Sequence, residues 1–244
     1  MRWKVPGQVM VSCVFPPRCP ICGELRFPWE SGTCTECAER LSYIQEPVCL
    51  ACGREISSCE KEYCTECEKL RPVVERNFAV WQYDRWMKRS IADFKYEGRT
   101  EYAPFYARNI VQCYGARLKR LGVSVLVPVP CSKKRKRFRG YNQAEVLSGV
   151  LAKELDCKVC RLLRRTKDTL PQNALAPAER KKNLIGAFAW DERAAGELVT
   201  VPAVVAIVDD IYTTGNTMNS CAAVLKQHGV REVYGISVCV GGAR

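Results

Sequence analysis

The chain has 244 residues, of which 47% are hydrophobic and 26% charged, and this composition excludes a disordered protein because an ordinary core can be buried. Its length suits one large domain, or a medium domain with a small appendage. The longest apolar run, Val201–Val208, is too short to span a bilayer, and Val9–Val14 is too short for the core of a signal peptide. We therefore expect a soluble, unexported protein of the cytoplasm that does not insert into a membrane.

Cysteines dominate the first third of the chain. Ten of the 16 lie within the first 67 residues, and eight of these ten form CxxC pairs. The pairs are Cys19 and Cys22, Cys34 and Cys37, Cys49 and Cys52, and Cys64 and Cys67. A shift of 30 residues places the first two pairs on the last two, so the region is an internal repeat of CxxCG, ten further residues and CTEC.

This spacing is typical of zinc ribbons, in which two knuckles supply four thiolates to one tetrahedral Zn²⁺. The two repeats therefore predict two closed, structural zinc sites, with Gly23 and Gly53 allowing a tight turn after the first pair of each repeat. Disulfides fit a reducing compartment poorly, and the spacings are not those of ferredoxin-type iron–sulfur ligation. Each repeat could fill its own site, or the knuckles of the two repeats could alternate in a cross-braced arrangement.

Charge divides the chain just after this repeat. Residues 1–77 carry 10 lysines and arginines against 11 acidic residues, whereas residues 78–244 carry 28 against 15. Pro72 follows soon after the last cysteine pair. We predict a double zinc-ribbon domain at residues 1–76 and a basic domain at residues 77–244.

The basic part alternates between helical and strand patterns. In chain order, helices are predicted at residues 84–96, 100–121, 142–155, 178–184 and 218–228. Strands are predicted at residues 123–129, 159–163, 187–190, 204–208 and 233–240. Asp84 and Asn142 are the expected N-caps, Glu145 forms a capping box with Asn142, and a basic loop precedes that helix. The alternation predicts an α/β fold with a mainly parallel sheet covered by helices on both faces.

The strand at residues 204–208 leads into the most informative stretch of the chain. Asp209 and Asp210 follow at what should be an exposed strand end, and the small, hydroxyl-rich run Thr213–Thr217 then enters a helix. Backbone NH groups, hydroxyls and a helix N-terminus suit a phosphate monoester, and the acids can accept hydrogen bonds from vicinal sugar hydroxyls. The plainer alternative is a strand, turn and helix with solvated acids. The sequence has no GxxxxGK[ST] P-loop, so an ATPase lacks its main motif.

The stretch Val205–Thr217 resembles the signature with which type I phosphoribosyltransferases bind phosphoribosyl pyrophosphate (PRPP). With the cysteine knuckles, further motifs resemble the ComF family over nearly the whole chain from Cys19, which implies a phosphoribosyltransferase-like sheet behind a double zinc ribbon. These motifs are Phe94-Lys95-Tyr96-x-Gly98, Val127-Pro128-Val129-Pro130, Arg139-Gly140-Tyr141-Asn142-Gln143, Thr169-x-Pro171-Gln172, and Arg180-x-x-Asn183 followed by Gly186-Ala187-Phe188.

The resemblance also implies how PRPP and Mg²⁺ would be held. Asp209 and Asp210 would meet the ribose hydroxyls at the catalytic centre. The 5′-phosphate would be bound by Thr213, Thr214, Gly215, Asn216 and Thr217. Two loops would face the pyrophosphate with Mg²⁺, through Pro130, Lys133 and Arg139 in the first and Arg165, Lys167 and Gln172 in the mobile second. Pyrophosphate would leave C1 through an oxocarbenium-like state that charge and the exclusion of water stabilise.

The family is linked to natural competence, which implies single-stranded DNA and competence proteins as partners. Members of the phosphoribosyltransferase class that act on hypoxanthine and guanine carry an aspartate base where this chain has Thr213, so an acceptor activated in that way is not expected. The basic run Lys133–Arg139 could be a solvated loop, but we prefer an anion site, with Phe138 and Tyr141 able to stack on bases. Two hypotheses follow: a Mg²⁺-dependent phosphoribosyltransferase of unknown acceptor, or a PRPP-regulated adaptor that binds single-stranded DNA.

Overall fold

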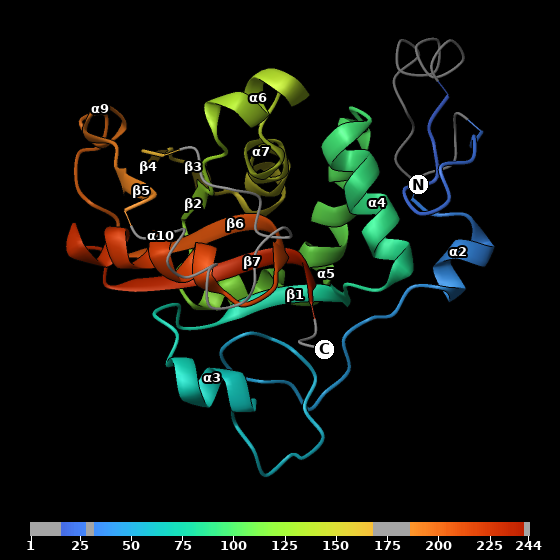
Figure 1. Ribbon diagram of the computed structural model, residues 1–244, viewed down its shortest axis with the longest axis horizontal. Coiled ribbons are helices and arrows are strands. Elements are labelled where there is room, and N and C mark those ends of the chain that lie inside the picture. The colour runs from blue at the N-terminus through green and yellow to red at the C-terminus, as the bar shows by residue number, and fades with distance from the viewer. Residues whose placement is uncertain (1–15, 28–31, 168–185, 242–244) are drawn as a thin grey trace.

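A parallel sheet forms the centre of the molecule, with the strand order β1-β7-β6-β2-β3 (Figure 1). The computed structural model describes residues 16–27, 32–167 and 186–241. The strands of this part are β1 (Asn77–Gln82), β2 (Val125–Pro128), β3 (Lys158–Val159), β4 (Leu163–Arg165), β5 (Phe188–Trp190), β6 (Val204–Tyr212) and β7 (Glu232–Val240). Its helices are α2 (Thr35–Glu39), α3 (Thr65–Leu70), α4 (Arg85–Tyr96), the 3₁₀ turn η1 (Thr100–Tyr102), α5 (Ala103–Arg120), α6 (Lys133–Arg139), α7 (Gln143–Leu155), α9 (Glu192–Ala195) and α10 (Asn216–Gln227).

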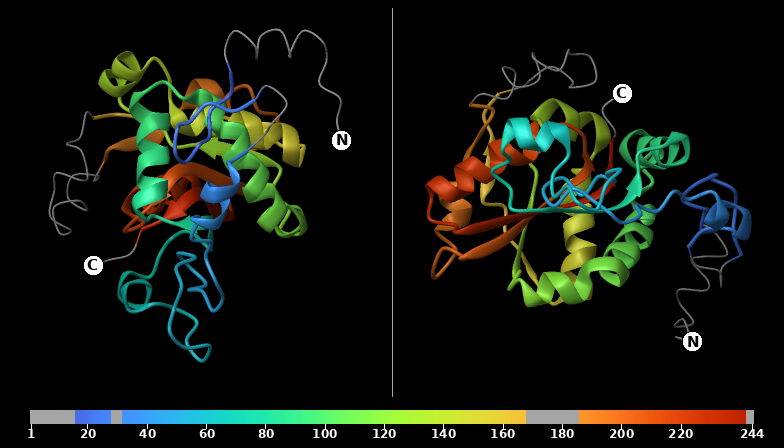
Figure 2. Two further views of the ribbon diagram at one scale, coloured as in Figure 1. Left: turned by 90° about the vertical axis from the view of Figure 1, so that its right-hand side faces the viewer. Right: turned by 90° about the horizontal axis from the view of Figure 1, so that it is seen from below.

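Helices cover both faces of the sheet, as predicted. Along β6, Ala206 and Val208 pack into one core with residues of α4, α5 and α7. Val205 and Ile207 point the other way, into a second core with residues of α10, β4 and β5. All four side chains are completely buried, and the two helical layers lie on opposite sides of the sheet (Figure 2). A strand buried on both faces explains the unbroken apolar run of this segment.

The predicted helix caps are confirmed. The Asp84 carboxylate accepts hydrogen bonds from the backbone NH groups of Trp86 and Met87, and the Asn142 side chain accepts one from Ala144. These bonds satisfy NH groups that have no partner within their own helix, so α4 and α7 begin where the sequence indicates. The capping box expected between Glu145 and Asn142 is not formed among the described residues, because the Glu145 carboxylate pairs with Lys136 and Arg161 instead.

Three predicted elements need correction. The basic loop is the helix α6, because the Ser132 hydroxyl caps its first turn and Gly140 ends it at φ +82°. The strand expected at residues 159–163 is divided, since β3 pairs with β2 in the main sheet and β4 pairs with β5 in an antiparallel pair. Strand β6 continues to Tyr212, so both acids lie within it. The helix expected at residues 178–184 lies outside the described residues.

The two cysteine repeats pack against different parts of the fold (Figure 1). Cys19, Ile21 and Cys37 of the first repeat join the core on the α4–α5 side. Cys49 and Cys52 of the second repeat join the core on the α10 side. The division of the chain at residues 76 and 77 stays a prediction. Among the described helices, none is both long and apolar enough to cross a membrane.

Candidate zinc centres and anion-binding site

Each cysteine repeat gathers its four thiols into one cluster. Cys19, Cys22, Cys34 and Cys37 form the first cluster, and Cys49, Cys52, Cys64 and Cys67 form the second, with the sulfur atoms of each within 4.8 Å of one another. The Sγ atoms of Cys19 and Cys34 lie 3.8 Å apart, and so do those of Cys52 and Cys64. Tetrahedral zinc with Zn–S bonds of about 2.3 Å requires sulfur atoms about 3.8 Å apart. Both clusters therefore fit a structural zinc ion.

This grouping settles the arrangement that the sequence left open. Ligands come from the two knuckles of one repeat, so the cross-braced arrangement is wrong. No disulfide joins the cysteines in the part of the chain that the structure describes. Gly53 adopts φ +75°, and a Cβ there would lie 2.7 Å from the carbonyl oxygen of Asn77. The first knuckle of the second repeat therefore needs glycine both for its turn and for its close approach to β1.

The acidic pair lies at the carboxyl end of β6. Asp210 is 9% exposed, whereas Asp209 is half-buried, and the backbone NH of Asp210 donates to Oδ1 of Asp209 at 2.9 Å. Nζ of Lys95, from the last turn of α4, lies 2.8 Å from Oδ1 of Asp210. The expectation that both acids would be exposed is wrong for Asp210, because α4 covers this end of the strand and supplies it with a cation.

Burial and the neighbouring charges set the protonation of this pair. The pKa of Asp209 is raised to about 7, first by burial and then by the Asp210 carboxylate, while Lys95 and Arg165 act in the opposite direction. Burial opposes the charge of Lys95, yet the Asp210 carboxylate raises the pKa of Lys95 above its ordinary value. Near neutral pH the site thus holds one ion pair and one carboxyl group that is ready to gain or lose a proton.

The loop after β6 leads directly into α10. Gly215 is the N-cap of α10 at φ +74°, and a Cβ on it would lie 2.1 Å from the Tyr212 hydroxyl, so only glycine fits. Asn216 and Thr217 form the first turn of α10 rather than part of the loop. The buried Oγ1 atom of Thr214 has no hydrogen-bond partner among the described residues. The N-terminus of α10 and the Thr214 hydroxyl together suit an anion.

A basic pocket of about 430 Å³ lies between the segment after β2 and the end of β4. Its lining comprises Pro130, Cys131, Ser132, Lys133, Lys136, Asn142, Glu145, Arg164, Arg165, Thr166 and Lys167. The pocket thus brings together Pro130, Lys133, Arg165 and Lys167, four of the six residues expected to meet pyrophosphate. It lies beside the acidic pair, because the NH of Val129 donates to the carbonyl of Val208 and Arg165 influences the pKa of Asp209.

Two of the expected pyrophosphate residues are not in this pocket. Arg139 donates to Oε1 of Gln143 at 2.9 Å and covers the Tyr96 ring, so its guanidinium contacts α7 and α4. Gln172 lies outside the described residues. Of the two rings proposed to stack on bases, Phe138 is 79% exposed, whereas the Tyr141 hydroxyl donates to the Phe94 carbonyl and its ring packs against the core.

Comparisons with known proteins agree with the cysteine repeat and the basic part. A model of the double zinc ribbon domain matches residues 10–68. The chain is 37% identical to competence protein F of Haemophilus influenzae over 109 residues, which cover 44% of this chain and 46% of that protein. It is 28% identical to DNA utilization protein YhgH of Salmonella typhimurium over 172 residues (69% and 73%), and 26% identical to competence protein ComFC of Bacillus subtilis over 160 (64% and 60%).

The double zinc ribbon and the similarity to these relatives support a ComF-family protein. The matched stretch spans about half the length of the Haemophilus relative. One residue with a clear structural role at this site, Lys95, received none from the sequence. Lys95 stands in a motif that supports the family resemblance, and it lies beside the buried Phe94 at the end of an amphipathic helix. That position could have indicated that the lysine points inward.

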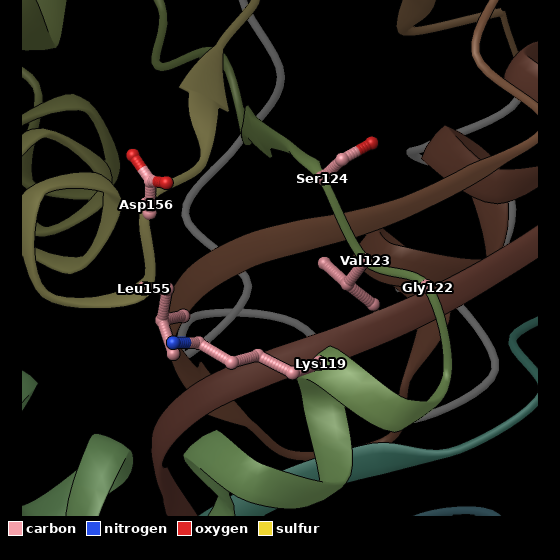
Figure 3. Close-up of a pocket in the computed structure, with 6 residues that line it drawn as sticks. All are labelled: Lys119, Gly122, Val123, Ser124, Leu155 and Asp156. Carbon is pink, nitrogen blue, oxygen red and sulfur yellow. The ribbon is translucent and has the colours of Figure 1, made fainter.

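A second cavity, of about 340 Å³, lies at the opposite end of the strands (Figure 3). It is lined by Lys119, Gly122, Val123, Ser124, Leu155 and Asp156. Ser124 comes just before β2, whereas the acidic pair comes at the end of the parallel strand β6, so the cavity is remote from the acids. None of the sequence-predicted site residues lines it, whereas those at the carboxyl edge lie where parallel sheets of this kind bind their ligands.

Proposed function

We propose that this ComF-family protein binds PRPP with Mg²⁺ in the manner of type I phosphoribosyltransferases and transfers the phosphoribosyl group to an acceptor. The supporting observation is that the acidic pair, the loop entering α10 and the basic pocket all lie at the carboxyl edge of the sheet. These three features match the three parts of PRPP: a diol, a phosphate monoester and a pyrophosphate.

Each part of the ligand has a partner of suited chemistry. Asp209 and Asp210 would accept hydrogen bonds from the ribose hydroxyls, while the Thr214 hydroxyl and the first NH groups of α10 would bind the 5′-phosphate. Lys133, Arg165 and Lys167 would balance the charge of the pyrophosphate as its bond to C1 breaks. Carboxylate and phosphate oxygens are the ligands that Mg²⁺ prefers, so Asp209 is the residue of this chain best suited to hold the ion.

The pH dependence of PRPP binding tests the proposal. Protonation of Asp209 removes an acceptor, so calorimetry with Mg²⁺ should give an affinity about tenfold lower at pH 6 than at pH 8 if its pKa of about 7 governs binding. Asp209→Asn should bind more weakly than wild type at pH 8 and lose this part of the pH dependence. Because PRPP itself titrates, the difference between variant and wild type is the informative quantity.

Asp156→Asn is the matched control, since Asp156 lines the remote cavity and asparagine tolerates its left-handed backbone. This control should behave as wild type. Absence of PRPP binding by the wild type, or an unchanged pH profile in Asp209→Asn, would remove the acids from the site. Release of pyrophosphate from PRPP on addition of candidate acceptors then separates a transferase from a protein that only binds PRPP.

A second function, the binding of single-stranded DNA within a competence system, is favoured by helix α6. The names of the relatives refer to competence and to DNA utilization. Six of the seven residues of α6 are lysine or arginine, and the seventh, Phe138, is 79% exposed. Cations with an exposed ring are the combination that binds a phosphate backbone and stacks on bases.

Salt dependence would reveal this second function. Lys134 and Arg137 lie on α6 outside the lining of the basic pocket. Replacing both with alanine should flatten the plot of log affinity against log salt by up to about 1.4 units, because each phosphate contact contributes about 0.7. Phe138→Ala should weaken binding by about 1–3 kcal/mol without changing the slope. Oligonucleotide titration at several salt concentrations measures both, and wild-type slope and affinity in all variants would exclude α6 as the DNA site.

A further inference from the structure

The second zinc ribbon contacts the loop that enters α10 through one arginine. Nη2 of Arg54 donates to the carbonyl of Gly241 at 2.7 Å and to that of Thr213 at 3.3 Å. Its Nη1 donates to Oε2 of Glu66 at 2.9 Å. Arg54 follows the first knuckle of the second repeat, and Glu66 lies between the cysteines of the second knuckle. One guanidinium, with its side chain only 18% exposed, therefore joins both knuckles to the first residue of the loop.

In the described part of the first repeat, this contact has no counterpart. The 30-residue shift that superposes the cysteines places Arg54 on Glu24, an exposed residue of opposite charge. The first cluster packs instead against the core on the α4–α5 side, away from α10. The two ribbons share the same metal ligands, yet within the described residues it is the second that contributes an arginine to the loop. Metal binding alone does not explain Arg54, because Glu24 holds the same place beside an equivalent cluster.

Two further contacts join the same parts of the molecule. Oδ1 of Asn219, in the first turn of α10, accepts hydrogen bonds from the backbone NH groups of Val73 and Val74, which follow the second ribbon. The Tyr212 side chain packs in one core with Cys49 and Cys52 and lies directly beneath Gly215. The start of the loop, its glycine and the first turn of the helix are thus each held by the second ribbon or by the residues that follow it.

We propose that the second zinc ribbon holds the phosphate loop in its binding conformation and that Arg54 is the positioning residue for the 5′-phosphate. This inference rests on the proposed PRPP site. Because the Arg54 guanidinium holds the Thr213 carbonyl in place, it also restricts the peptide units that follow. The NH groups at the start of α10 are therefore ordered before the ligand arrives. Because the zinc-bound ribbon has already ordered the loop, the ligand does not bear the entropic cost of ordering it. The ligand therefore binds more tightly.

Coupling of this kind is reciprocal. If the ribbon favours phosphate binding, a phosphate in the loop must stabilise the ribbon. We therefore expect ribose 5-phosphate to reduce the amount of zinc that the second cluster gives up at equilibrium to a coloured chelator. A role confined to the stability of the ribbon would leave this equilibrium unaffected by the ligand.

The test compares Arg54→Gln with Glu24→Gln, its counterpart in the first repeat. Zinc content and melting temperature are measured first, followed by calorimetry with ribose 5-phosphate, which carries the monoester, and with inorganic pyrophosphate, which does not. Arg54→Gln should lower the affinity for ribose 5-phosphate by roughly 2- to 30-fold, the range found for coupling through a residue that does not touch the ligand. The affinity for pyrophosphate should be unchanged. Arg54→Lys should recover part of the loss, and Glu24→Gln should match wild type.

Each outcome decides the matter. Equal ribose 5-phosphate affinity in wild type and Arg54→Gln overturns the positioning role while the proposed function stands. If the wild type binds neither ribose 5-phosphate nor PRPP, the proposed function fails and the inference fails with it. If Arg54→Gln loses zinc, Asn219→Ala takes its place, since it breaks the second contact without touching a knuckle. Unchanged ribose 5-phosphate affinity in a zinc-replete Asn219→Ala then overturns the proposal.

Discussion

Replacing Cys49 and Cys52 by serine is expected to reduce the zinc content by one equivalent and to destabilise the whole protein. Cys49 is completely buried and Cys52 is 1% exposed, and both lie in the core that holds Ala79 and Val240 of the sheet. Loss of the second zinc therefore removes part of the support of β1 and β7 as well as the ribbon. Structural zinc contributes about 10–16 kcal/mol to the folding of zinc-finger peptides, so the effect should exceed that of any surface substitution.

Metal analysis and thermal unfolding measure the two parts of this prediction. Cys59→Ser and Cys113→Ser are matched controls, because both cysteines are exposed and belong to neither cluster. They should retain two zinc equivalents and the wild-type melting temperature. The double variant Cys49→Ser, Cys52→Ser could instead retain its full zinc content or unfold at the wild-type temperature. Either result would show that the second cluster is not a structural zinc site.

The cysteine clusters were predictable because their ligands are local. Within each repeat only 11 residues separate the two knuckles, so the spacing restricts how the thiols can meet. The caps at Asp84 and Asn142 and the buried run of β6 were predictable for the same reason. They depend on hydrogen bonds or periodicity within one element.

Contacts between distant segments could not be predicted in this way. Arg54 and the carbonyl of Thr213 are 159 residues apart in the sequence, and no periodic pattern links them. Helix α6 has no apolar face to indicate a helix. Its cap at Ser132 and the ion pair between Lys136 and Glu145 of α7 support it once the neighbouring elements are in place.

The pairing of Lys95 with Asp210 leads to the second large effect. Lys95→Met would leave the Asp210 carboxylate buried without its cation, because the two side chains are only 19% and 12% exposed. Removal of one partner of a buried ion pair typically costs about 3–5 kcal/mol, since the remaining charge is unpaired. We expect a loss of that order at pH 8 in urea unfolding. Lys88→Met, on the exposed side of the same helix, should change stability by less than about 0.5 kcal/mol.

A double substitution shows whether the cost comes from the unpaired charge. Lys95→Met combined with Asp210→Asn removes both charges and should recover most of the lost stability. The pKa of Lys95 is raised by Asp210, so the contribution of the pair is complete below the ordinary lysine pKa and is lost only as the pH rises through the raised value. Measurements at pH 8 therefore compare the wild type, in which Lys95 is fully charged, with a variant that has no charge at this position. If the double variant is as unstable as Lys95→Met, the stability comes from packing of the lysine stem.

The same variant should move the pH dependence of ligand binding. Lys95 lowers the pKa of Asp209, which burial and Asp210 raise to about 7. Without the lysine the pKa of Asp209 must rise further, so the midpoint of PRPP binding should shift to higher pH. Adding Asp210→Asn removes the neighbouring negative charge and should shift the midpoint back down. A midpoint that stays at the wild-type value in Lys95→Met would mean that Asp209 does not control binding, even if the stability of the protein depends on the pair.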